Sequence, residues 1–91
     1  MNSNFLENWR GPISDGTQEK WKPASATSLS DDQKQSLRDG YIFEKPKGAF
    51  ITKVFVCDES GIFWSVIIPN YLLEPLKDDL ETNGWHRICE A

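Results

Sequence analysis

Two apolar runs joined by a short turn decide the fold: AFITKVFVC at residues 49–57, DESG at residues 58–61 and IFWSVII at residues 62–68. Both runs are rich in β-branched and aromatic residues, which favour strands. The turn ends in Gly61, where a backbone with positive φ costs little. Because YIF at residues 41–43 and the turn-forming KPKG at residues 45–48 precede the first run, we predict a three-stranded antiparallel meander over residues 41–68.

Leucines recur at helical spacing after the meander, at positions 72, 73, 76 and 80. Charged side chains fall on the opposite side, so the pattern predicts an amphipathic helix with an acidic outer face. Pro75 is disfavoured in a helix interior, so we expect the regular helix to begin there and Asn83-Gly84 to end it. WHRIC at residues 85–89 then predicts a last strand.

A short helix is predicted before the meander, over residues 30–39. Ser30 and Gln33 form a capping-box pattern at its start, and Gly40 suits the position just past its end. Since Leu37 is its only strong apolar residue, we expect this helix to cover little. Residues 1–29 are rich in Asn, Ser, Gly, Thr and Pro and have no regular period, so we interpret them as an irregular N-terminal arm.

The expected architecture is α+β, with a small, mainly antiparallel sheet and the element order α-β-β-β-α-β. Residues 30–91 form this single domain, one leucine-faced helix packs on one face of the sheet, and residues 1–29 form the arm. A sheet with one solvated face alternates apolar and polar residues, and these strands do not. The second face therefore needs cover from the arm, from a second copy of the chain or from a different protein.

The composition allows one small domain. The chain has 91 residues, a net charge of −4 and a sequence pI near 4.8. This size leaves no room for a second core, and the acidic balance argues against a protein whose main task is to neutralise phosphate. Thirteen of residues 1–48 and twenty-two of residues 49–91 are hydrophobic, so we expect the core in the C-terminal half.

Catalytic and metal-binding residues are scarce. His86 is the only histidine, and Cys89 lies three positions away on the same predicted strand, so the two side chains point to opposite faces. Cys57 faces His86 only if its strand neighbours the last one. One histidine and two scattered cysteines do not make a tetrahedral site, and no phosphate-binding or hydrolase motif occurs. We expect no enzyme, no metal and no cofactor.

The two cysteines and the absence of a leader predict a cytoplasmic protein. Reduced, half-buried thiols are the expected state of Cys57 and Cys89, and a disulfide between neighbouring strands is the alternative. No apolar run is long enough to span a membrane, and residues 1–20 lack the basic start and apolar region of a signal peptide.

Aromatic and basic residues alternate in two places, Trp9-Arg10 with Lys20-Trp21-Lys22, and the stretch from Tyr41 to Lys53 that includes Phe50. Such residues anchor protein interfaces. We predict a small protein-binding protein, an adaptor, inhibitor or regulatory subunit of bacterial or phage type, that acts by stoichiometric docking or masking. Its partner is another protein, or a second copy of the chain. The expected apolar anchors and charged rim are Trp9, Trp21, Trp64, Glu74, Asp78, Asp79 and Glu81.

The alternative is a nucleic-acid-binding module, because rings beside cations also suit single-stranded nucleic acid. It would use an aromatic and lysine-rich hairpin made of Tyr41, Phe43, Lys45, Lys47 and Lys53. The net negative charge makes this the less favoured prediction. A third interpretation assigns the rings to the core and the lysines to protection of a sheet edge.

Overall fold

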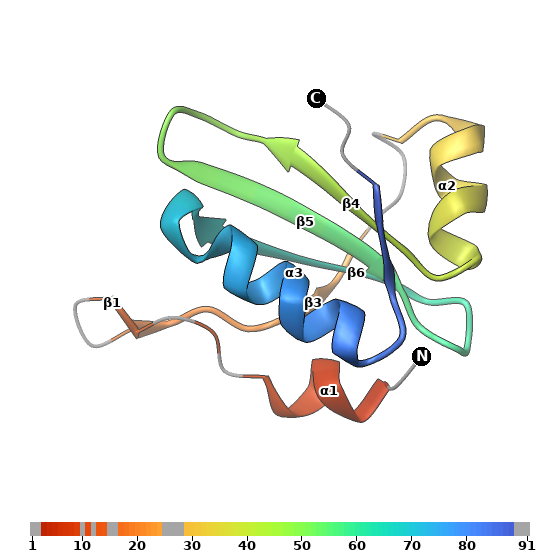
Figure 1. Ribbon diagram of the computed structural model, residues 1–91, viewed down its shortest axis with the longest axis horizontal. Helices are drawn as coiled ribbons and strands as arrows, with labels where there is room; N and C mark the ends of the chain where they lie inside the picture. Colours follow the sequence, from red (N-terminus) through yellow and green to blue (C-terminus); the bar gives the residue numbers. More distant parts are fainter. Residues whose placement is uncertain (1–2, 10, 12, 15–16, 25–28, 89–91) are drawn as a thin grey trace.

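A computed structural model describes residues 3–9, 11, 13–14, 17–24 and 29–88. The elements follow in the order α1 (Ser3–Asn8), β1 (Ile13–Ser14), β2 (Thr17–Gln18), β3 (Lys22–Pro23), α2 (Asp31–Arg38), β4 (Tyr41–Pro46), β5 (Ile51–Cys57), β6 (Phe63–Pro69), η1 (Asn70–Leu72), α3 (Leu73–Thr82) and β7 (His86–Ile88) (Figure 1). The predicted α+β class, the mainly antiparallel sheet and the order of the elements from α2 onward are confirmed.

The main sheet has five strands in the order β3-β6-β5-β4-β7. The predicted meander forms its centre, with Val54 opposite Glu44 on one side and opposite Val66 on the other. β7 pairs with β4 in parallel, and β3 pairs antiparallel with β6. The fifth strand, β3, lies in the predicted irregular arm. The sequence does not predict this strand, because two residues are too few to show a period.

The leucine-faced helix α3 lies across one face of the sheet, and α1 lies beside it (Figure 1). Leu76 and Leu80 of α3 are buried against Val54 and Val66 of the sheet. Two residues of the arm, Leu6 and Trp21, are buried in the same cluster. The ring-bearing part of the arm therefore packs on the face that α3 already covers.

The second face is covered at one end by α2, which corrects the expectation that this helix covers little. Leu37 of α2 is fully buried, and Leu29 just before the helix is buried beside it, against Phe43, Phe55 and Cys57. The guanidinium group of Arg38 lies over the ring of Phe63, with its carbon 5.4 Å from the ring centroid. One leucine suffices because Leu29, in the same cluster, and the Arg38 side chain, over the Phe63 ring, add to the cover.

The helix boundaries follow local rules, with one correction. The capping box at Ser30 is confirmed, since its hydroxyl accepts from the Gln33 backbone N–H and the Gln33 side chain accepts from the Ser30 backbone. α3 begins at Leu73, two residues before Pro75. Pro75 fits there because the first N–H groups of a helix have no partner within it.

Candidate binding surface

Large apolar side chains are exposed at one end of the sheet. Phe50, in the loop between β4 and β5, is 82% exposed, Tyr71 in η1 is 74% exposed, and Ile51 at the start of β5 is 40% exposed. The loop and η1 lie at the end of the sheet away from α2 (Figure 1). We call Phe50, Ile51 and Tyr71 the aromatic tip.

The aromatic tip is held in place by Asn70, the residue between β6 and Tyr71. Its backbone N–H donates to the carbonyl of Phe50 at 2.8 Å, and its side-chain amide donates to the carbonyl of Ala49 at 3.0 Å. The amide oxygen accepts a 2.6 Å bond from the buried hydroxyl of Thr52. Asparagine bonds readily to nearby backbone at strand ends, and here it joins two segments twenty residues apart in the chain. Asn70 thus holds the β4–β5 loop at two successive residues, Ala49 and Phe50.

Three lysines lie next to the aromatic tip. Lys45 and Lys53 are direct cross-strand partners on β4 and β5, and Lys47 follows at the end of β4, where its N–H donates to the carbonyl of Ile51 at 3.2 Å. A pocket of about 220 Å³ opens between them. We call it the lysine pocket, and it is lined by Lys45, Pro46, Lys47, Lys53 and Phe55.

The electrostatics of the lysine pocket are positive. Within the described part of the chain, no ion pair joins Lys45, Lys47 or Lys53 to a carboxylate. The Lys53 ammonium lies 5.1 Å from the ring centroid of Phe55, a favourable cation–π contact. Because cross-strand partners share a face of the sheet, Ile67 continues the row of Lys45 and Lys53 on that face.

The residues of the predicted nucleic-acid site are only partly brought together. Lys45, Lys47 and Lys53 meet at the lysine pocket. Phe43 is buried under α2, and Tyr41 packs against His86 with ring centroids 5.6 Å apart, at the other end of β4. The aromatic members of that set therefore do not stand as open rings beside the lysines.

The three tryptophans predicted as anchors are packed within the chain. Trp21 is 4% exposed in the core, and the ring of Trp9 lies 5.9 Å from it. Trp64 is half-buried, and its indole N–H donates to the Asp58 carboxylate at 2.8 Å. The structure does not place these side chains together on one open surface.

The acidic residues predicted as a rim share α3, but three of them bind a cation of the same chain. Glu74, Asp78 and Glu81 each place an oxygen 2.8–3.2 Å from the guanidinium of Arg87 on β7. Asp79 is exposed, and its carbonyl accepts from the Asn83 side chain at 2.8 Å. Arg87 is not among the site residues predicted from the sequence, although a basic residue on a strand that follows an acidic helix is a signal for this pairing.

A second cation, Lys77, links α3 to the sheet. Its ammonium is buried and lies 3.0 Å from Glu44 of β4 and 2.8 Å from Glu74. Burial lowers the pKa of Lys77, but the hydrogen bonds to Glu74 and Glu44 outweigh it and the pKa is raised overall. The hydrogen bond from Lys77 is also the main reason that the pKa of Glu74 is lowered. This network stabilises the fold and reduces the negative charge of the acidic face.

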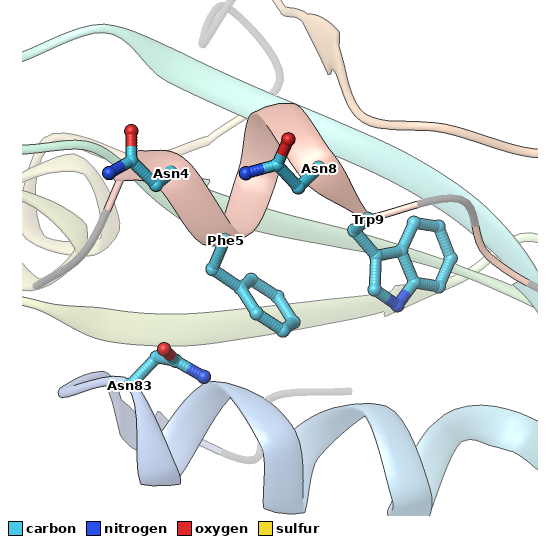
Figure 2. A pocket seen from close by; sticks show the side chains of 5 residues that line it. All are labelled: Asn4, Phe5, Asn8, Trp9 and Asn83. Atoms are coloured by element: carbon cyan, nitrogen blue, oxygen red, sulfur yellow. The ribbon is translucent and has the colours of Figure 1, made fainter.

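A second hollow, of about 340 Å³, lies where α1 meets the end of α3, and it is lined by Asn4, Phe5, Asn8, Trp9 and Asn83. Figure 2 shows Phe5 pointing from α1 towards α3, with Asn4 and Asn8 along α1 above it and Asn83 at the end of α3. The Phe5 ring is 6.2 Å from the buried ring of Trp85. The hollow is a seam between two packed helices, and no charged side chain lines it.

The groups considered for catalysis do not form a centre. β7 pairs with β4, so His86 and Cys57 lie on strands that are not neighbours. Cys57 carries a free thiol whose pKa is raised, mainly by burial, and this makes it a poor nucleophile. Cys89 lies outside the described residues. In the part of the chain that the structure describes, no three metal-binding side chains cluster and no helix has the length and apolarity to cross a membrane.

Four residues of this surface were not predicted from the sequence: Asn70, Thr52, Ile51 and Tyr71. No local sequence signal indicates the contact between η1 and the β4–β5 loop that brings them together. Phe50 belongs to the aromatic and basic pattern noted in the sequence but not to the predicted set of site residues. Comparison of the chain with protein-family models, with curated proteins and with solved structures finds no match.

Proposed function

We propose that this chain binds another protein through the aromatic tip, and acts by stoichiometric docking or masking as an adaptor, inhibitor or regulatory subunit. The observation that carries the proposal is the pair of exposed rings, Phe50 at 82% and Tyr71 at 74%, held on two segments that Asn70 joins. Exposed aromatic side chains that a scaffold holds in place are the usual anchors of protein interfaces.

The energetics favour binding at this place. Burial of a large apolar side chain contributes about 1.5–3 kcal/mol, so the rings of Phe50 and Tyr71 together supply several kcal/mol to an interface. Association costs free energy when loops must become ordered. The hydrogen bonds of Asn70 to the backbone of Phe50 and Ala49 reduce that cost, because the loop is already held in the free chain.

The proposed anchors, Phe50 and Tyr71, differ from the tryptophans predicted from the sequence. A partner that used Trp21 would have to displace it from the core, where it is 4% exposed. Phe50 and Tyr71 need no such rearrangement. The binding roles predicted for the tryptophans and for the acidic residues of α3 stay predictions. As part of the same proposal the chain turns over no substrate, and it works in the cytoplasm, where the free thiol of Cys57 persists.

Site-specific photocrosslinking in the source cells tests the proposal. A benzophenone amino acid replaces Phe50 in one variant, Tyr71 in a second and Ile62 in a third. Ile62 is the matched control, since it is 49% exposed and lies in the turn between β5 and β6. We expect one and the same protein, in a one-to-one adduct, at positions 50 and 71 and not at position 62. Absence of a protein adduct at positions 50 and 71, or equal adducts at all three positions, would show that the aromatic tip is not the binding surface.

A further inference from the structure

We propose that the segment of the partner that meets this chain is acidic: aspartate or glutamate carboxylates bind in the lysine pocket while neighbouring apolar side chains pack on Ile51 and Ile67. This inference rests on the proposed function and adds the chemistry of the partner.

The positive charge of the lysine pocket is uncompensated. Lys45 and Lys53 face each other across β4 and β5, and like charges directly opposite destabilise a sheet. The described residues provide no carboxylate partner for them, whereas Lys77 and Arg87 each lie within 3.2 Å of two or more carboxylates. A chain with net charge −4 has acidic side chains available, and yet this face keeps its positive charge open. Charge complementarity across an interface supplies specificity and speeds encounter.

The size and lining of the lysine pocket suit a carboxylate side chain. Its volume of about 220 Å³ accommodates a carboxylate side chain together with water, since one water takes up about 30 Å³ in the liquid. Phe55, which is 1% exposed, lines it and provides an apolar wall. Ion pairs are stronger beside apolar groups than in open water, so a carboxylate in this pocket is bound more tightly than one on a flat surface.

The side chains around the lysine pocket favour an acidic protein over a nucleic acid. Single-stranded nucleic acid binds where bases stack on open rings beside cations. Here the rings on the lysine face, Phe43 and Phe55, are buried, and the exposed rings Phe50 and Tyr71 do not line the lysine pocket. The aliphatic neighbours of the lysines on that face are the exposed Ile51 and the half-buried Ile67. Carboxylates interspersed with apolar side chains match this mixture of aliphatic and basic groups.

A titration followed by backbone amide shifts in NMR tests the inference. The probes are the peptide Glu-Glu-Leu-Glu-Glu, the same peptide with glutamine in place of glutamate, and a single-stranded thymidine decamer. We expect the glutamate peptide to shift Lys45, Lys47, Ile51 and Lys53, with affinity that falls as salt is added, and the glutamine peptide to leave them unchanged. Lys45→Glu/Lys53→Glu should lower the affinity for the glutamate peptide by about tenfold or more, as loss of charge pairs does.

The control is Lys20→Glu/Lys34→Glu, which has the same net charge as Lys45→Glu/Lys53→Glu but changes lysines outside the pocket. It should bind the glutamate peptide within about twofold of the wild type, since distant surface charges are screened. Tighter binding of the thymidine decamer than of the peptide at the same lysines would overturn the inference in favour of nucleic acid. Self-association that the pocket variant abolishes would overturn it in favour of a second copy.

The photocrosslink separates failure of this inference from failure of the proposed function. If the adduct at position 50 forms equally well in the Lys45→Glu/Lys53→Glu background, the acidic partner is wrong and the protein-binding function stands. If no adduct forms at position 50 even when Lys45 and Lys53 are unchanged, the proposed function fails, and this inference fails with it.

Discussion

At the scale of single residues, the like charges of Lys45 and Lys53 lower the stability of the sheet. The two side chains share a face on neighbouring strands and no described carboxylate neutralises them. A sheet selected only for stability would carry opposite charges there. The pair is therefore the residue-scale feature that supports the proposed contact of this face with another molecule.

The stability of a single reversal tests this conflict. Lys45→Glu creates an opposite-charge pair with Lys53, so the free energy of unfolding should rise by about 0.2–1 kcal/mol. Urea unfolding of the two proteins at low salt measures the change, and the gain should shrink in high salt. The double variant Lys45→Glu/Lys53→Glu again opposes like charges and should match the wild type. A single variant less stable than the wild type would mean that the lysines do not repel each other.

A second residue-scale prediction concerns Lys77 and alkaline pH. Its pKa in the folded chain lies above the ordinary value of 10.5, because Glu74 and Glu44 bind the ammonium despite its burial. A raised folded-state pKa means that the stabilisation is complete below pH 10.5 and is lost as the pH rises through the folded-state value. Lys77→Met should therefore have a flatter decline of the free energy of unfolding above that pH.

Urea unfolding as a function of pH measures the two profiles. The control is Lys20→Met, which removes an exposed lysine and should leave the wild-type decline in place. Equal slopes for Lys77→Met and the wild type would show that the ammonium is bound no better in the folded chain than in the unfolded one.

At the scale of elements, α2 shows how a polar helix can still seal a sheet face. Its only strong apolar residue, Leu37, is fully buried over Phe43 and Phe55. Leu37→Ala should lower the free energy of unfolding by about 2–5 kcal/mol, as buried leucine truncations do. Chemical denaturation measures it, with Gln35→Ala on the exposed side of the same helix as the control, expected within about 0.5 kcal/mol of the wild type. A small effect of Leu37→Ala would mean that α2 is only loosely attached.

The elements with a local signal were predictable from sequence. The meander follows from two strand-forming runs and a turn, α3 from the spacing of its leucines, and the start of α2 from Ser30 and Gln33. β3 was not predictable, because its pairing with Ser65 and Trp64 brings together segments some forty residues apart. The cover provided by α2 depends on Leu29, which lies outside the helix.

The candidate site was predictable in part for the same reason. The three lysines stand out in the sequence, but their meeting in one pocket requires the register that places Lys45 opposite Lys53. The aromatic tip depends on Asn70, whose bonds to the backbone of Phe50 and Ala49 are long-range contacts. A pattern of residue types shows neither.

At the scale of the whole molecule, the two charged faces differ in how they are compensated. The acidic side of α3 is partly neutralised from within by Arg87 and Lys77, while the lysine pocket beside the aromatic tip has no carboxylate partner among the described residues. The N-terminal segment closes the α3 side through Leu6 and Trp21. The open end of the sheet, away from α2, therefore combines exposed rings with free positive charge, and this is the surface that we assign to a partner.

The most direct test of that assignment is calorimetric titration of the protein that is crosslinked at positions 50 and 71 with the wild type, Phe50→Ala, Tyr71→Ala and the control Ile62→Ala. We predict one-to-one binding for the wild type, a loss of about 2 kcal/mol or more for each of the first two variants, as for interface anchors, and unchanged affinity for the control. Affinity that survives both Phe50→Ala and Tyr71→Ala would contradict the account.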